Sequence, residues 1–202
     1  MAGILSNLRT TVIVSFVLTA IYLGAYVMSG AIALDGAFWQ AFARWTHVVA
    51  GIMWIGLLWY FNFVQIPNMP NIPDEQKPAI GKVIAPAALF WFRWGAAFTV
   101  LTGLTVAGLR GYSMEVLSLG LVSDVYTPQY SFIGIGMWLA IIMAINVWFV
   151  IWPNQKIALG MVEADAEAKP KAARTAMLFS RTNTLLSFPM LIAMAMAQTV
   201  FG

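Results

Sequence analysis

Cysteine is absent from the chain, histidine occurs once, and Asp, Glu, Lys and Arg together make up only 9% of the 202 residues. Without cysteine there can be no disulfide, thiolate metal site, iron–sulfur cluster or covalent CxxCH haem attachment. The one histidine, His47, has no acidic residue near it in the sequence to orient it, so a serine or cysteine hydrolase centre is not indicated either. Any haem must therefore be held without covalent attachment.

The scarcity of charge is matched by an excess of apolar residues, which make up 61% of the chain. So few charges cannot solvate the surface of a globular domain of this size. A membrane-spanning helix needs about 20 predominantly apolar residues. The sequence predicts an all-α integral membrane protein with five transmembrane helices in one bundle and one domain over residues 1–202, the spans being 11–34, 40–66, 84–109, 131–152 and 177–200. Continuous apolar runs exclude a β-barrel.

Basic residues are distributed unevenly between the two sides that five spans define. Nine lie on one side, namely Arg9, Lys77, Lys82, Arg93, Lys156, Lys169, Lys171, Arg174 and Arg181. The other side has only Arg44 and Arg110. By the positive-inside rule we expect a cytoplasmic amino terminus, an outer carboxyl terminus and a location in the bacterial inner membrane. The basic residues show no nucleic-acid-binding pattern.

The connections between spans differ in composition. Residues 67–86 contain five prolines and cannot form one continuous helix. Residues 113–122 are too short to span, and we expect a short interfacial helix there between spans three and four. Alanine-rich residues 159–177 should extend spans four and five, with a break at Pro170. Small residues could allow close helix packing at Gly51, Gly56, Gly95, Gly103, Gly108, Gly134 and Gly136.

A polar stripe is predicted on the second span. At about 100 degrees per residue, one side of that helix contains His47, Gly51, Trp54, Leu58, Asn62 and Gln65. Polar side chains are costly against lipid, so this side should face the bundle. His47 and Asn62 are separated by about 22 Å along the axis, which places His47 near the outer face and Asn62 near the cytoplasmic face.

The cytoplasmic level of the stripe brings together residues from four spans. The candidate substrate-binding residues there are Arg93, Arg181, Asn62, Asn146 and Asn183. Two arginines and several amides could hold a small anion. The alternative is that the arginines snorkel to the interface while the amides hydrogen-bond helix to helix.

At the outer level, His47 could be an axial ligand to the iron of haem b. A methionine sulfur can complete the other side, and Met28, Met137, Met194 and Met196 are expected at similar depth, with Met53 deeper. The alternative is a histidine that is hydrogen-bonded between helices. Residue spacing does not decide between them.

Four stretches together resemble a known family: HVVAGIMWIGLLWYFNFVQIP, FRWGAAFTVLTGL, GMWLAIIMAINVWFVIWPNQK and RTNTLLSFPMLIAM. They are similar, in this order, to the membrane domain of the bacterial membrane-bound, cytochrome-c-linked urate oxidases (urate hydroxylases). The resemblance implies a redox protein of purine degradation, with His47 matching a family histidine. The pattern of His47, Trp54, Ile55 and Gly56 also resembles helices of haem-binding protoporphyrinogen oxidases and copper-resistance permeases. The candidate cofactor-binding residues are thus His47, Met28, Met137 and Trp54.

The sequence departs from this family in two respects. The larger members have a cytochrome c domain with a CxxCH motif, whereas these 202 residues contain no cysteine, so the resemblance is to a short form. Where the family would have a histidine–asparagine pair before the final span, this chain has Arg181, Thr182 and Asn183.

Three function classes follow. The first is a redox protein that binds haem b in the lipid bilayer, passes electrons to a cytochrome c or respiratory-chain partner, and accepts an anion such as urate. The second is an accessory or assembly subunit of a larger membrane complex without a cofactor of its own. The third, a transporter or channel, has less support because all eight acidic residues lie outside the predicted span centres.

Overall fold

The computed structural model describes residues 2–122 and 125–201, which contain helices and no strand. Three of the helical segments have π geometry (η1, η3 and η4) and one is a 3₁₀ turn (η2). The elements in chain order are α1 (Ala2–Leu5), α2 (Leu8–Met28), α3 (Gly36–Trp59), η1 (Tyr60–Gln65), α4 (Ile66–Asn68), η2 (Met69–Asn71), α5 (Lys77–Ala79), η3 (Ile80–Ile84), α6 (Ala85–Arg110), α7 (Ser113–Leu117), α8 (Pro128–Ile145), η4 (Asn146–Ile151), α9 (Trp152–Ala158) and α10 (Ala168–Val200).

These elements join into five helical stretches that are long and apolar enough to cross a membrane. Their bounds are Leu8–Met28, Gly36–Asn71, Lys77–Arg110, Pro128–Ala158 and Ala168–Val200. The prediction of five such helices in an all-helical, multi-pass protein is confirmed. The predicted sidedness and the inner-membrane location stay predictions.

The chain divides into two compact units, and the division falls inside α3 after Phe42. The first unit contains α1, α2 and the start of α3, and α2 has no buried residue. Asn7 caps α2 through its side-chain oxygen, which accepts a hydrogen bond from the Thr10 N–H at 3.2 Å. The prediction of a single domain stays a prediction.

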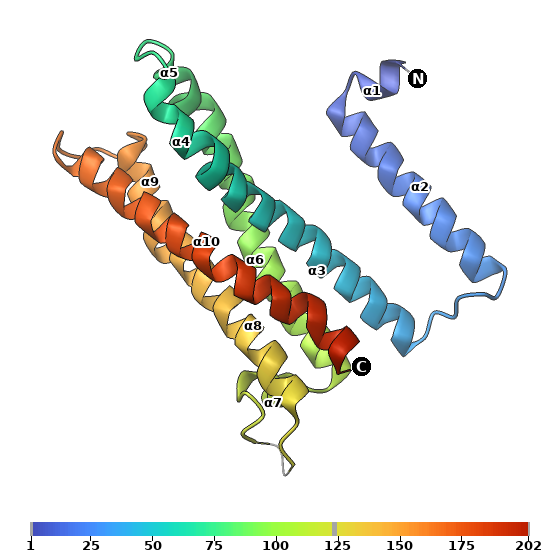
Figure 1. Cartoon of the computed structure of the whole chain (residues 1–202). Helices are drawn as coiled ribbons and strands as arrows, with labels where there is room; N and C mark the ends of the chain where they lie inside the picture. Colours follow the sequence, from blue (N-terminus) through green and yellow to red (C-terminus); the bar gives the residue numbers. More distant parts are fainter. Residues whose placement is uncertain (1, 123–124, 202) are drawn as a thin grey trace. The chain divides into compact units, whose positions relative to one another are not determined.

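The second unit, from Ala43 onward, is a helical bundle. Figure 1 shows α3, α6, α8 and α10 running lengthwise, with α7 at one end of the bundle and α4, α5 and α9 at the other. Trp54, Leu58, Phe92, Met143 and Val147 are among the most buried side chains of its core. Large apolar side chains also cover much of its exterior, as expected for helices in contact with lipid.

Several predicted helix limits were wrong. The first span ends at Met28 instead of residue 34, since Gly30 adopts a left-handed conformation (φ 76°) that stops the helix. The interfacial helix predicted over residues 113–122 ends at Leu117, because Leu119 and Gly120 also have positive φ. In this helix Val116 is fully buried against α6 and α8.

The break predicted at Pro170 was also wrong. Pro170 lies in the first turn of α10, where a backbone N–H has no intrahelical acceptor and its absence costs little. The chain instead breaks after α9, at Gly160, whose φ of 69° is left-handed. The predicted extension of spans four and five toward this connection is confirmed by α9 and the start of α10.

Each π-helical segment ends two residues before a proline. The closing i→i+5 hydrogen bonds are donated by the N–H groups of Ile66, Ala85 and Trp152, each directly before Pro67, Pro86 or Pro153. A proline ring clashes with the carbonyl four residues earlier in an α-helix, and a wider turn relieves that clash. The prolines thus account for the positions of η1 and η4 in the chain, and these two segments contain Asn62 and Asn146.

Candidate functional site

His47 lies on α3 and is hydrogen-bonded to α6. Its Nδ1 is 2.9 Å from the Thr99 carbonyl oxygen and 3.3 Å from Thr102 Oγ1. A carbonyl can only accept, so Nδ1 carries the proton and donates it to Thr99. A neutral imidazole then has its lone pair on Nε2, the atom that can bind a metal. Gly103 makes room for the ring, because a Cβ there would lie 3.0 Å from His47 Cε1.

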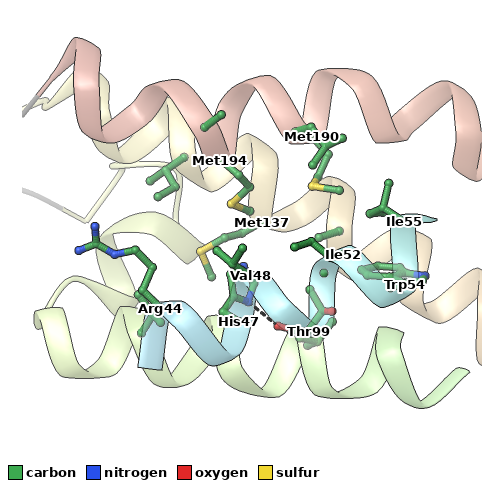
Figure 2. A pocket seen from close by; sticks show the side chains of 18 of the residues that line it. Arg44, His47, Val48, Ile52, Trp54, Ile55, Thr99, Met137, Met190 and Met194 are labelled. Atoms are coloured by element: carbon green, nitrogen blue, oxygen red, sulfur yellow. Dashed lines mark hydrogen bonds between the residues drawn. The ribbon is translucent and has the colours of Figure 1, made fainter. Parts of the chain in front are cut away.

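The imidazole forms part of the wall of a cavity of about 670 Å³. Side chains from α3, α6, α8 and α10 line it, and Figure 2 shows His47 among them with its hydrogen bond to Thr99. The lining is mainly apolar, for example Val48, Ile52 and Ile55. This volume is in the range of cofactor and ligand pockets.

Methionine sulfurs from two helices face the cavity opposite α3. Met137 of α8 and Met190 and Met194 of α10 all line it (Figure 2). Met137 and Met194 were predicted at this depth from the sequence, and Met190 was not. Met53 and Met196 are 42% and 41% exposed and do not line the cavity. Each helix rotates by about 100 degrees per residue, so depth alone does not place a side chain on the inner face.

Met28, the remaining methionine predicted as a ligand, lies in the first unit at the end of α2 and is 90% exposed there. Its role stays a prediction.

Trp54, also predicted near the cofactor, is fully buried and forms part of the cavity wall. Its Nε1–H has no acceptor among the described residues. Gly95 of α6 packs directly on its backbone, since a Cβ on Gly95 would lie 3.2 Å from the Trp54 nitrogen. A buried N–H without an acceptor is costly, and a water or an occupant of the cavity would satisfy it.

Multiligand metal sites need several donor side chains around one point. Residues 2–122 and 125–201 contain no group of three or more His, Cys, Asp or Glu side chains arranged in this way. Haem differs, because the macrocycle supplies four nitrogens and the protein supplies only the axial ligands. Among the residues that line the cavity, His47 and the three methionines are of the types that can be haem ligands.

The amide cluster predicted at the cytoplasmic level forms hydrogen bonds between helices. Asn146 Nδ2 donates to Asn183 Oδ1 at 2.9 Å, and Asn183 Nδ2 donates to the Met143 carbonyl, also at 2.9 Å. Asn62 Nδ2 donates to Ser180 Oγ at 2.7 Å, which links η1 to α10. The Oδ1 atom of Asn62 is buried and has no hydrogen-bond donor among the described residues.

The two arginines predicted beside these amides lie in different surroundings. The Arg93 guanidinium carbon is 3.3 Å from the centre of the Trp152 ring and 5.8 Å from that of Trp148, while Nε donates to the Leu89 carbonyl. Arg181 is exposed on α10, whereas Asn183 is fully buried two residues later. The two residues lie about 200 degrees apart around the helix.

Thr99, Met190 and Arg44 are among the cavity-lining residues that sequence reasoning missed. Met190 could have been found from its spacing, because Asn183, Ser187, Met190 and Met194 follow one face of α10. Thr99 acts through its backbone carbonyl, so its side chain gave no signal.

We expect Asn183→Leu to destabilise the second unit, because it leaves the Asn146 amide and the Met143 carbonyl without partners. The free energy of unfolding should fall by about 1 to 3 kcal/mol. Reversible unfolding in mixed detergent micelles measures it. The control is Thr182→Val on the same helix, since the exposed Thr182 hydroxyl bonds only to the Leu178 carbonyl one turn away. Equal losses in both variants would contradict a structural role for the amide pair.

The chain's carboxyl-terminal half is similar to a known family. A family model described as "Urate oxidase N-terminal" matches residues 106–199, which run from the end of α6 through α7, α8 and α9 to the end of α10. The match includes Met137, Met190 and Met194 but not the segment with His47. No curated protein and no solved structure matches the chain. This similarity is consistent with a urate oxidase-related protein.

Proposed function

We propose that the protein is an integral membrane redox protein related to urate oxidases, which holds haem b at His47 and passes electrons to a cytochrome c or respiratory-chain partner. The proposal depends on the hydrogen bond that the His47 imidazole makes through Nδ1. Its Nδ1 proton is donated to Thr99 across 2.9 Å, so the Nε2 lone pair is available in the wall of a large, mainly apolar cavity.

The residues around the cavity fit such a group. His47 would hold the haem iron, and Met137, Met190 or Met194 could supply a second donor atom. When bound, haem supplies one-electron oxidation and reduction. The Thr99 carbonyl fixes the tautomer and the orientation of the imidazole.

Isolation of the protein in mild detergent tests the proposal. We expect a Soret band that shifts when dithionite is added, and a haem that acid acetone extracts and that forms a b-type pyridine haemochromogen. A colourless protein that does not acquire a Soret band with added haemin would overturn the proposal. It would leave the accessory-subunit hypothesis, which predicts co-purification with partner subunits and no cofactor.

For the substrate, we propose a planar anion such as urate, with Arg93 as its charged contact. The urate oxidase similarity supports the substrate class. Stacking on Trp152 holds the guanidinium in place, and Nε is used by the Leu89 carbonyl, so the Nη edge is left for an oxyanion.

We expect Arg93→Ala to lower kcat/KM for urate by about 100-fold, corresponding to loss of one charge-assisted contact. Arg93→Lys should recover only part of this loss, because lysine keeps the charge without the planar fork. Urate consumption by membranes containing each variant measures it. Arg181→Ala serves as a comparison, because Arg181 lies on α10 with its side chain exposed. Unchanged urate consumption in Arg93→Ala would exclude this substrate contact.

A further inference from the structure

We infer that Arg44 binds the anionic edge of the molecule in the His47 cavity, and that for haem b this edge is the pair of propionate carboxylates. The inference rests on the proposed function and concerns the orientation of the group. It assigns a residue that the sequence marked only as one of two basic residues on the outer side.

Arg44 has no ion-pair partner among the residues that the structure describes. It is half-buried, lines the cavity one turn before His47 on α3, and has a buried Nε for which those residues offer no hydrogen-bond acceptor. The ion pair within the described residues is Lys77 with Asp74, at the opposite end of the bundle. A buried N–H without an acceptor is costly, and here it is the Nε–H of Arg44. An anionic occupant would offset that cost.

The polar part of the cavity lining lies at the same end as Arg44. Tyr112 follows the end of α6, and Gln198 and Thr199 lie in the last turn of α10. These two helix ends lie at the end of the bundle where the second unit's part of α3 begins. Beyond His47 the lining is mainly apolar, with Ile52, Ile55 and Ile141 as examples. The cavity is therefore built for an amphiphile that has an apolar body and an anionic end.

Haem b has this chemistry, because its two carboxylates extend from one edge of a flat apolar ring. If His47 held the iron, Arg44 would be the cation of the lining that could hold the propionates. A fatty acid or an anionic phospholipid also has an apolar body and an anionic end, but it has no metal ion to which the imidazole could bind. The experiment must therefore separate the carboxylates of haem from those of a lipid.

The test uses the full chain, produced in haem-deficient cells and purified in a neutral detergent. Haemin and haemin dimethyl ester, in which both propionates are esterified, are titrated separately while the Soret band is followed. The variants are Arg44→Gln and the control Arg110→Gln, a cation at the same end of the bundle that does not line the cavity. Helical content and elution volume confirm that each variant is folded.

We expect Arg44→Gln to weaken haemin binding by about 10- to 100-fold, the effect of losing a hydrogen bond between two charged groups. The same variant should bind the dimethyl ester as wild type does, and Arg110→Gln should match wild type with both compounds. Arg44→Lys should recover part of the haemin affinity.

Three results would overturn the inference while leaving haem binding intact. These are equal affinity of wild type and Arg44→Gln for haemin, equal weakening for haemin and its ester, and retention of a bound anionic lipid by haemin-loaded wild type that haemin-loaded Arg44→Gln does not show. The last would assign Arg44 to a lipid head group. If wild type itself acquires no Soret band, the proposed function fails and this inference with it.

Discussion

His47→Leu is expected to abolish the Soret band of the isolated protein. Leucine fills a similar volume but has no lone pair, so the axial bond from Nε2 and the hydrogen bond to Thr99 are both lost. Haem retention should fall by at least about 100-fold, as expected for a lost ligand in a site with few other polar contacts. Haem content per chain, measured after extraction of the purified variant, gives the result.

Two companion variants show whether the loss is specific. Thr102→Val removes only the weaker contact to Nδ1, at 3.3 Å, and should retain haem. His47→Gly should regain a Soret band when imidazole is added, because the free base can occupy the vacated space. Full haem content in His47→Leu, with a spectrum equal to that of wild type, would contradict ligation by His47.

Gly136→Val is expected to destabilise the second unit strongly. Even one added methyl at Gly136 would lie 2.7 Å from the Ala193 Cβ and 3.5 Å from the Met190 carbonyl, both on α10. Such overpacking costs about 1 to 3 kcal/mol, and the upper end is expected where the neighbours are backbone or a short side chain. It would also separate α8 from α10 where Met137 and Met190 face the cavity. Unfolding in mixed micelles should shift, and haem retention should fall with it.

For unfolding, the matched control is Gly56→Val on α3, where an added Cβ meets nothing within 4 Å. Gly56 lines the cavity, so haem retention is not compared in this variant. Both substitutions change helix propensity in the same way, so the difference between them measures packing alone. If both variants have the same free energy of unfolding as wild type, α8 and α10 do not pack as closely at Gly136 as the structure requires.

The number of helices was predictable because it depends on apolar length alone. Their limits were less so. Gly30 ends α2 early through a backbone conformation that hydropathy does not register, and Pro170 fits a first turn instead of breaking a helix. The π-helical segments were not predicted either, although the prolines that follow them are plain in the sequence.

For the candidate site, the sequence placed the inner face of α3 correctly, since Trp54 and Leu58 are fully buried on the side that also contains His47. Rotation on the other helices was harder to predict. Arg181 and Asn183 were grouped by depth, yet one is exposed and the other buried. Arg44 was missed because a basic residue near a span end is usually a topology signal, and only the cavity gives it another role.

An experimental density map of the protein as purified would show directly whether His47 holds a haem. We expect flat density in the cavity, continuous with Nε2 of His47, while Nδ1 still donates to the Thr99 carbonyl. An imidazole turned outward toward lipid, with acyl chains filling the cavity, would contradict it.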